Sequence, residues 1–147
     1  MTTDSHGSVQ VSDGLSTVLT VLEPSSAPES AVLESNLAVL RQAGIQVRYQ
    51  RYPLEAGERQ AQIGVNTRGQ ILSSALSDPE SAYVLAARGG YGASDLLRYL
   101  DWSALSSLPK TVVVGFSDIS ALQVALYAQL GWPAIHGPMP GSSLWSN

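Results

Sequence analysis

Short apolar runs rich in β-branched residues alternate along this chain with longer stretches whose apolar residues recur every three or four positions. The first pattern predicts buried strands, and the second predicts amphipathic helices. Strands are expected at residues 17–22, 45–49, 83–87 and 111–115, with a short fifth strand at 133–136.

Helices are expected between these runs. Residues 29–43 carry regularly spaced leucines on one helical face, and Gly44 follows in the position of a C-cap. Residues 58–76 form a more polar helical stretch that contains Gly64 and Gly69. Because glycine destabilises the interior of a helix, we expect a break within this stretch.

The alternation of strands and helices predicts an α/β fold, with a doubly wound, mainly parallel sheet and helices on both faces. The runs at 83–87 and 112–114 are apolar at nearly every position, which is typical of strands buried on both sides. We expect one such domain at residues 17–140 and a disordered tail at residues 1–16.

The strand expected at residues 111–115 leads into a sharp connection that carries a serine. Gly115 lets the backbone turn, Ser117 follows, and a helical pattern begins at Asp118. In hydrolases with α/β folds, this arrangement places a nucleophilic serine beside the free N–H groups and positive dipole of a helix N-terminus. Ser117 is therefore a candidate nucleophile, and the backbone N–H of Asp118 is a candidate oxyanion donor.

A purely structural role for the same residues stays open. Serine and aspartate are common helix N-caps, so Ser117 and Asp118 would equally serve to satisfy the first N–H groups of the helix. In addition, Ile119 occupies the position of the second glycine in the G-x-S-x-G motif of such hydrolases.

A glycine-rich turn follows the strand at residues 83–87. It spans Arg88–Gly92 (RGGYG), and a helix is expected to open at Ser94 and Asp95. Neighbouring strands of one parallel sheet would bring this turn and Ser117 to the same carboxyl edge, where open α/β sheets bind ligands. A phosphate cradle and a plain strand–helix turn are the alternatives, although the lysine of a P-loop is absent.

The composition argues against several classes of function. A net charge of −4 without any basic cluster makes nucleic acid and anionic membranes unexpected partners. The absence of cysteine excludes disulfides and thiolate metal sites. The polar N-terminus, which has no lysine or arginine before Arg41, lacks the pattern of an export signal, so the cytoplasm is the default location.

Three segments in this order, ARGGYGASDLLRYLDW, KTVVVGFSDISAL and HGPM at residues 136–139, resemble the LD-carboxypeptidases, which are serine peptidases of cell-wall recycling. The microcin-C immunity peptidases are similar. The early LTVLEPSSAP resembles the family's opening strand and turn, so the resemblance covers roughly residues 17–139. It implies a flavodoxin-like nucleophile domain that helps to remove the terminal D-residue from a murein tetrapeptide, without a metal or other cofactor.

The resemblance also implies roles for individual residues. Ser117 would be the nucleophile, and the backbone N–H of Asp118 would be one oxyanion donor. The backbone N–H of Gly90 would be the other donor, with Gly89 as the alternative. The carboxylate of Asp118 would cap or brace the turn.

Family members carry a second domain that supplies the Glu and His of a Ser-His-Glu relay. We therefore expect residues 141–147 to begin an interdomain linker and the relay to lie in a missing C-terminal domain. Neither His6, in the polar tail, nor His136, in the HGPM segment, is expected to be the base. The chain alone is then expected to be inactive, and a homodimer is possible through its exposed interdomain face. A phosphate- or nucleotide-binding module and a non-catalytic α/β domain are the alternatives.

Overall fold

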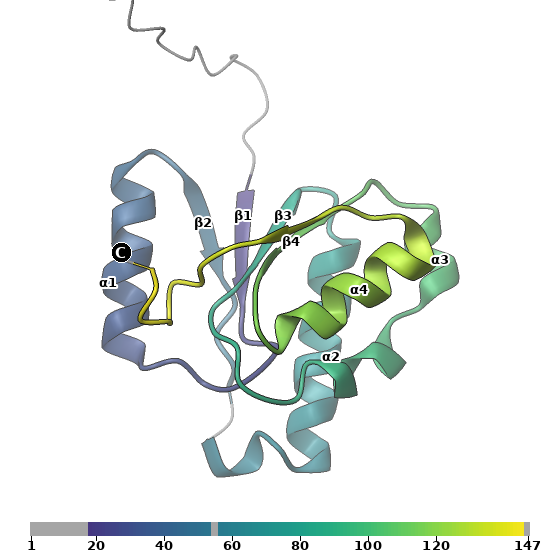
Figure 1. The fold of residues 1–147 in the computed structure, drawn as a ribbon, viewed down its shortest axis with the longest axis horizontal. Helices are drawn as coiled ribbons and strands as arrows, with labels where there is room; N and C mark the ends of the chain where they lie inside the picture. The colour runs from purple at the N-terminus through teal and green to yellow at the C-terminus, as the bar shows by residue number, and fades with distance from the viewer. Residues whose placement is uncertain (1–17, 54–55, 146–147) are drawn as a thin grey trace, which may run out of the picture.

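The computed structural model describes residues 18–53 and 56–145, and the tail predicted at residues 1–16 lies outside them. Strands and helices alternate through most of this length (Figure 1). The strands are β1 (Val18–Leu22), β2 (Gln46–Tyr49), β3 (Tyr83–Ala86), β4 (Val112–Gly115) and β5 (Ala134–His136). The α-helices are α1 (Ser30–Gln42), α2 (Gln62–Ser77), α3 (Trp102–Ser106) and α4 (Ile119–Leu130), and two 3₁₀ helices are η1 (Ala56–Glu58) and η2 (Ser94–Tyr99).

The five strands form one parallel sheet in the order β2-β1-β3-β4-β5. This is the strand order of flavodoxin-like folds, so the predicted fold class is confirmed. Because β3 lies between β1 and β4, the turns that follow these three strands emerge side by side at the carboxyl edge.

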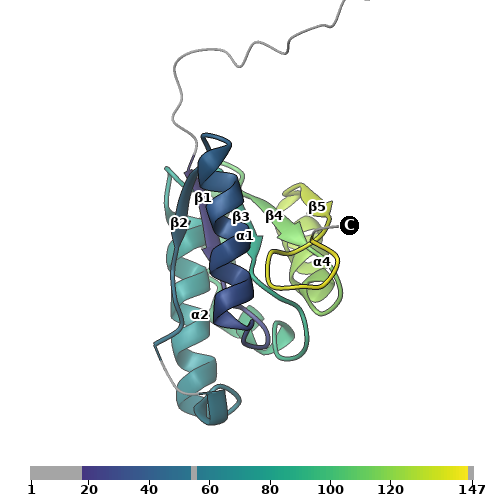
Figure 2. The ribbon, with the colours of Figure 1, turned by 90° about the vertical axis from the view of Figure 1, so that its left-hand side faces the viewer.

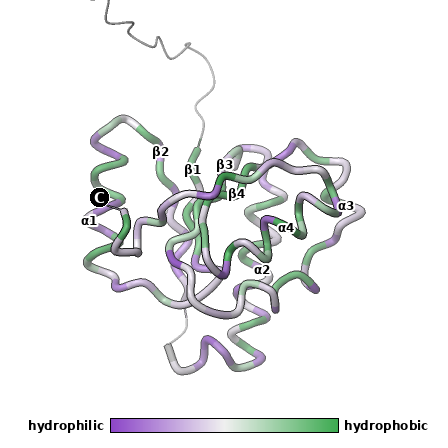
Figure 3. The backbone as a smooth tube through the Cα atoms, in the orientation of Figure 1, coloured by the Kyte–Doolittle hydropathy of each residue, from purple (hydrophilic) through white to green (hydrophobic). Residues whose placement is uncertain are grey.

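Helices cover both faces of the sheet, and each face has its own apolar core (Figure 1). On one face, α1 packs Leu33 and Leu37 against Val21 and Leu85 of the central strands. On the other face, α2, η2, α3 and α4 enclose a larger core. In Figure 2, α1 lies in front of the sheet, and β4 and β5 extend beyond it, beside the C-terminal segment. Figure 3 shows that the most hydrophobic stretches run through the strands at the centre.

The prediction of a break within the stretch at residues 58–76 is wrong, because α2 is continuous through both glycines. A Cβ atom at Gly64 would lie 2.2 Å from the carbonyl oxygen of Glu58, and one at Gly69 would lie 2.5 Å from the ring of Tyr99. The glycines therefore permit close packing against α2, and this packing outweighs their low helix propensity. The helix also begins later than predicted, at Gln62.

The other predicted elements are found with small shifts at their ends. Helix α1 ends at Gln42, and Gly44 follows with a left-handed φ of 85°, as expected for a helix terminus. The helix expected at Ser94 is the 3₁₀ helix η2, and α3 then starts after Asp101, whose carboxylate accepts a hydrogen bond from the N–H of Ala104 at 2.9 Å. In the part of the chain that the structure describes, no helix combines the length and hydrophobicity needed to cross a bilayer.

Candidate active site

Ser117 lies in a sharp turn between β4 and α4, on the carboxyl edge of the sheet. Its φ is 62°, and among the described residues it is the only non-glycine residue with a positive φ. Such a left-handed backbone is unfavourable for serine and is concentrated at functional sites. The side chain of Ser117 is exposed to solvent, so the turn presents its hydroxyl at the edge where ligands of α/β sheets bind.

The side chains of this turn do not cap helix α4. Asp118 occupies the N-cap position, yet its side chain makes no capping hydrogen bond. Instead, its Oδ2 accepts hydrogen bonds from the hydroxyl of Ser25 and from the backbone N–H of Ala93, the latter at 2.8 Å. Of the two roles considered for this carboxylate, the structure therefore shows a brace between turns.

The glycine-rich turn after β3 packs directly against Ser117. A Cβ atom at Gly89 would lie 3.1 Å from the Cβ and 3.3 Å from the Oγ of Ser117. Gly90 has a φ of 121°, and a Cβ there would lie only 2.2 Å from the Oγ of Ser26. The predicted meeting of this turn with Ser117 is thus present. An added Cβ would collide with Ser26 at Gly90 and would crowd Ser117 at Gly89.

The turn after β1 completes the arrangement, and its role was not foreseen from the sequence. The N–H of Ser26 donates to the carbonyl of Gly89, and the Oγ of Ser26 accepts from the N–H of Tyr91, both at 3.3 Å. Together with the bond from Ser25 to Asp118, these contacts tie the turns after β1, β3 and β4 into one unit. The Pro24–Ser26 segment gave only a turn signal, which does not say what its hydroxyls contact.

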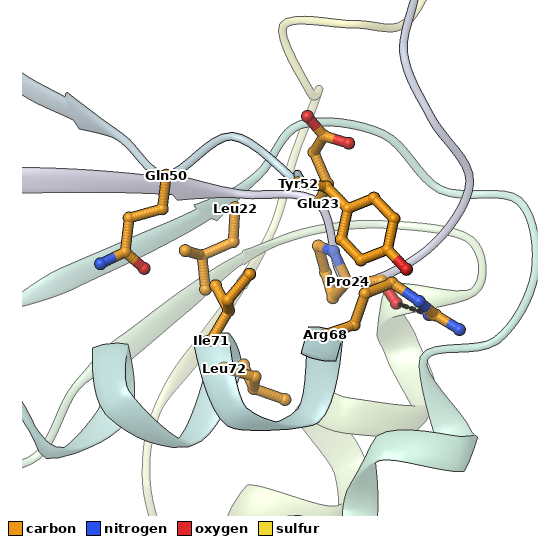
Figure 4. A pocket seen from close by; sticks show the side chains of 8 residues that line it. All are labelled: Leu22, Glu23, Pro24, Gln50, Tyr52, Arg68, Ile71 and Leu72. Carbon is orange, nitrogen blue, oxygen red and sulfur yellow. Dashed lines mark hydrogen bonds between the residues drawn. The ribbon is translucent and has the colours of Figure 1, made fainter. Parts of the chain in front are cut away.

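Two buried arginines donate hydrogen bonds to the backbone of the turn after β1. The guanidinium of Arg59 donates to the carbonyl of Ser25 at 2.8 Å and forms an ion pair with Glu23 at 2.8 Å. Arg68 donates to the carbonyl of Pro24 at 2.6 Å (Figure 4). Burial, and then the nearby charge of Arg59, lower the pKa of Arg68.

Tyr49, the last residue of β2, contacts the same ion pair, because its hydroxyl donates a hydrogen bond to Glu23. Burial and this hydrogen bond raise the pKa of Tyr49.

These arginines were missed because they lie in a stretch that the sequence presents as a polar helix. Arginine is rarely buried unless it is paired or hydrogen-bonded, so its solvation here depends on carbonyl groups that are distant in sequence. Arg59 and Ser25 are 34 positions apart. No local signal in the sequence connects them.

A buried glutamine fixes the strands on the other side of the site. The amide of Gln123 donates to the carbonyls of Val113, Gly115 and Ile135, at 3.2, 3.1 and 2.9 Å. It therefore ties the start of α4 to both β4 and β5. Next to it, the ring of His136 contacts Phe116 edge-on, with centroids 6.0 Å apart.

No group of three or more His, Cys, Asp or Glu side chains in the described ranges is arranged to hold a metal ion. The groups that this edge presents are a serine hydroxyl, backbone N–H groups and a carboxylate that braces the turns.

Comparison with known proteins agrees with this geometry. The model of the LD-carboxypeptidase N-terminal domain matches residues 19–137. The chain belongs to this family. The resemblance inferred from the three motifs is therefore confirmed, and the matched region contains both the glycine turn and Ser117.

Individual relatives are named for cell-wall peptides. The murein tetrapeptide carboxypeptidase of Pseudomonas aeruginosa is 38% identical over 119 residues, which cover 81% of this chain and 38% of that protein. A muramoyltetrapeptide carboxypeptidase from Oxalobacter formigenes has a similar structure, with a TM-score of 0.71 and 25% identity over 89% of this chain and 43% of that one. This chain thus spans about two fifths of the length of these relatives.

A microcin immunity protein shares the fold. MccF, solved in complex with glutamyl sulfamoyl guanosine, superimposes with a TM-score of 0.75 at 18% identity, over 91% of this chain and 40% of that one.

Proposed function

We propose that this chain is the nucleophile domain of a serine LD-carboxypeptidase that removes the terminal D-amino acid from a murein tetrapeptide. The observation that carries the proposal is the left-handed backbone of Ser117 at a strand-to-helix turn, with the glycine turn packed against its hydroxyl. A strained residue of this kind persists only where the surrounding structure enforces it, and such strain is common at nucleophile turns.

The proposed reaction starts with Ser117. Its Oγ attacks the carbonyl carbon of the last peptide bond, and its proton passes to a general base. The carbonyl oxygen becomes an oxyanion, which accepts hydrogen bonds from the backbone N–H groups of Asp118 and Gly90. The C–N bond then breaks, and the terminal residue leaves as an amine that takes up this proton. Water hydrolyses the resulting ester and restores the Ser117 hydroxyl.

The hydrogen bonds around the turns support this choice of donors. Within the described ranges, the N–H groups of Asp118, of Gly90 and of its alternative Gly89 donate to no protein acceptor. Their neighbours Tyr91 and Ala93, by contrast, already donate to the side chains of Ser26 and Asp118.

The general base is proposed to come from outside this chain, as part of a Glu-His pair. This follows the family resemblance and the fact that the chain spans about two fifths of its relatives. His136 is exposed and contacts the ring of Phe116, and it carries no role in this proposal.

The test uses a two-domain form, in which this chain is followed by the C-terminal part that its relatives contain. We expect this form to release D-alanine from murein tetrapeptide, and Ser117→Ala to reduce kcat by several orders of magnitude. Circular dichroism of the same samples shows whether the variant is folded. A folded Ser117→Ala variant with near-normal turnover would refute the proposal.

A further inference from the structure

A groove of about 540 Å³ lies beside Arg88, at the start of the turn that follows β3. It lies between the first turns of α1, the turn after β3 and the C-terminal segment, and its charged side chains are Glu29 and Arg88. The C-terminal segment is held against the end of β3, because the N–H of Gly141 donates to the carbonyl of Ala87 at 2.7 Å. Arg88 directly precedes Gly89, the residue that packs on Ser117.

The guanidinium of Arg88 is exposed and only partly used by the protein. One nitrogen, Nη1, donates to the carbonyl of Ala27 at 3.0 Å. In the described ranges, Arg88 forms no ion pair with a carboxylate. Because arginine has five N–H donors in a planar fork, the remaining ones suit a carboxylate from outside the chain.

The chain has eight lysines and arginines, all within the described residues. The seven other than Arg88 either interact with groups of the protein or lie far from Ser117. Arg59 and Arg68 are buried against backbone carbonyls. Lys110 lies at the amino end of β4, on the opposite edge from Ser117. Arg51 follows β2, which is separated from β4 by two strands, whereas Arg88 follows the strand next to β4.

The three remaining cations are engaged elsewhere. Arg41 and Arg48 form ion pairs with carboxylates of the chain, and Arg98 lies over the ring of Tyr99. Arg88 is therefore the cation best placed beside the Ser117 turn.

We propose that Arg88 binds the free carboxylate of the substrate's terminal residue and so makes this site specific for the C-terminal end of a peptide. The inference rests on the proposed function. In the scissile unit, the carboxylate carbon follows the attacked carbonyl carbon after one nitrogen and one Cα, so its charge lies at a short, fixed distance from Ser117. An enzyme that cleaves only the last peptide bond has to recognise this charge, and a net charge of −4 gives no general attraction for it.

The first test measures binding to the 147-residue chain itself, with acetyl-D-alanine and its amide as matched probes. In NMR titrations at millimolar concentration, the acid should shift the Arg88 Nε–H signal and the amides of Gly89 and Gly90, while the neutral amide should not. Arg88→Gln should weaken binding of the acid by about 10- to 100-fold, as expected for a lost charge-assisted pair. Arg98→Gln, which removes another exposed arginine, should leave it unchanged.

A second variant keeps the inference testable without altering Arg88. Glu29 lines the same groove and carries a like charge to the ligand, so Glu29→Gln should strengthen binding of the acid. Equal shifts with acid and amide, no shift with either probe, or unchanged binding in Arg88→Gln would each overturn the inference.

Ser117→Ala separates this inference from the proposed chemistry, because removing the hydroxyl should leave binding of the acid intact. Carboxylate binding in a chain whose two-domain form is inactive would refute the proposed function alone. Turnover of amidated and free tetrapeptides at equal rates by the two-domain form would refute the role of Arg88 alone.

Discussion

The hydroxyl of Ser25 donates a hydrogen bond to the carboxylate of Asp118, although the two residues are 93 positions apart. The same carboxylate oxygen accepts the N–H of Ala93 at 2.8 Å. One side chain therefore joins the turns after β1, β3 and β4. The carboxylate next to the candidate nucleophile therefore has a structural role, which is to connect these turns.

Replacing this carboxylate should loosen the three turns together. We expect Asp118→Ala to lower the free energy of unfolding by about 1–3 kcal/mol, because it leaves the Ser25 hydroxyl and the Ala93 N–H without their acceptor. Asp118→Asn keeps one carbonyl oxygen and should cost less. Urea unfolding measures both values. Glu29→Ala is the control, since Glu29 is exposed and its side chain makes no capping hydrogen bond to α1, and an equal loss in it would contradict the bracing role.

Gly90 should tolerate no side chain, for two separable reasons. Its φ of 121° strains any L-residue, and a new Cβ would lie 2.2 Å from the Oγ of Ser26. Gly44 is a matched control, because it has a φ of 85° but nothing within 4 Å of the added Cβ. Gly44→Ala should cost about 1 kcal/mol in unfolding free energy from backbone strain alone. Gly90→Ala should cost clearly more, and equal losses would argue against the close approach.

Helix α2 offers a test in which propensity and packing predict opposite signs. For an open helix position, replacing glycine with alanine stabilises by about 1 kcal/mol. At Gly69, however, the new Cβ would lie 2.5 Å from the ring of Tyr99. We therefore expect Gly69→Ala to lower the thermal midpoint, while Ser74→Ala, on the exposed side of α2, should leave it unchanged or slightly higher. A stabilised Gly69→Ala variant would show that this packing is loose.

These cases show which parts of the molecule its sequence can predict. The strands are recognisable because their apolar runs are local, and parallel order then places the turns of β3 and β4 at one edge. The contacts of Arg59, Arg68 and Ser25 connect elements that are far apart in sequence, so no local pattern reveals them. The prediction of a break in α2 failed for the same reason. Gly69 is required by its close contact with Tyr99, which is distant in sequence, and not by its neighbours along the helix.

The 147-residue chain should release D-alanine from murein tetrapeptide at a negligible rate. A serine without its general base is a poor nucleophile at neutral pH, and binding and an oxyanion hole alone leave activity orders of magnitude lower. The measurement is D-alanine release by the purified chain, compared with the two-domain form. Substantial release by the chain alone would contradict this prediction and would make His136 the first residue to test as a base.

The backbone strain at Ser117 gives the most direct test of the nucleophile. With a φ of 62°, the folded backbone strains serine by about 1–2 kcal/mol relative to glycine. The greater flexibility of glycine in the unfolded chain offsets part of this difference. Ser117→Gly should therefore keep or slightly raise the free energy of unfolding. In the two-domain form it should abolish turnover. Ser117→Asp should also fold, because aspartate accepts a left-handed backbone, and should be equally inactive.

Ser120→Gly is the matched control, because Ser120 lies in the first turn of α4 with an ordinary helical backbone. There, glycine should lower the free energy of unfolding by about 0.5–1 kcal/mol and leave most of the activity. Opposite outcomes at two serines three positions apart would mean that the turn holds Ser117 in a strained conformation for its chemistry. If Ser117→Gly were instead as destabilising as Ser120→Gly, the backbone strain at Ser117 would be refuted. If Ser117→Gly retained activity, the role of Ser117 as the nucleophile would be refuted.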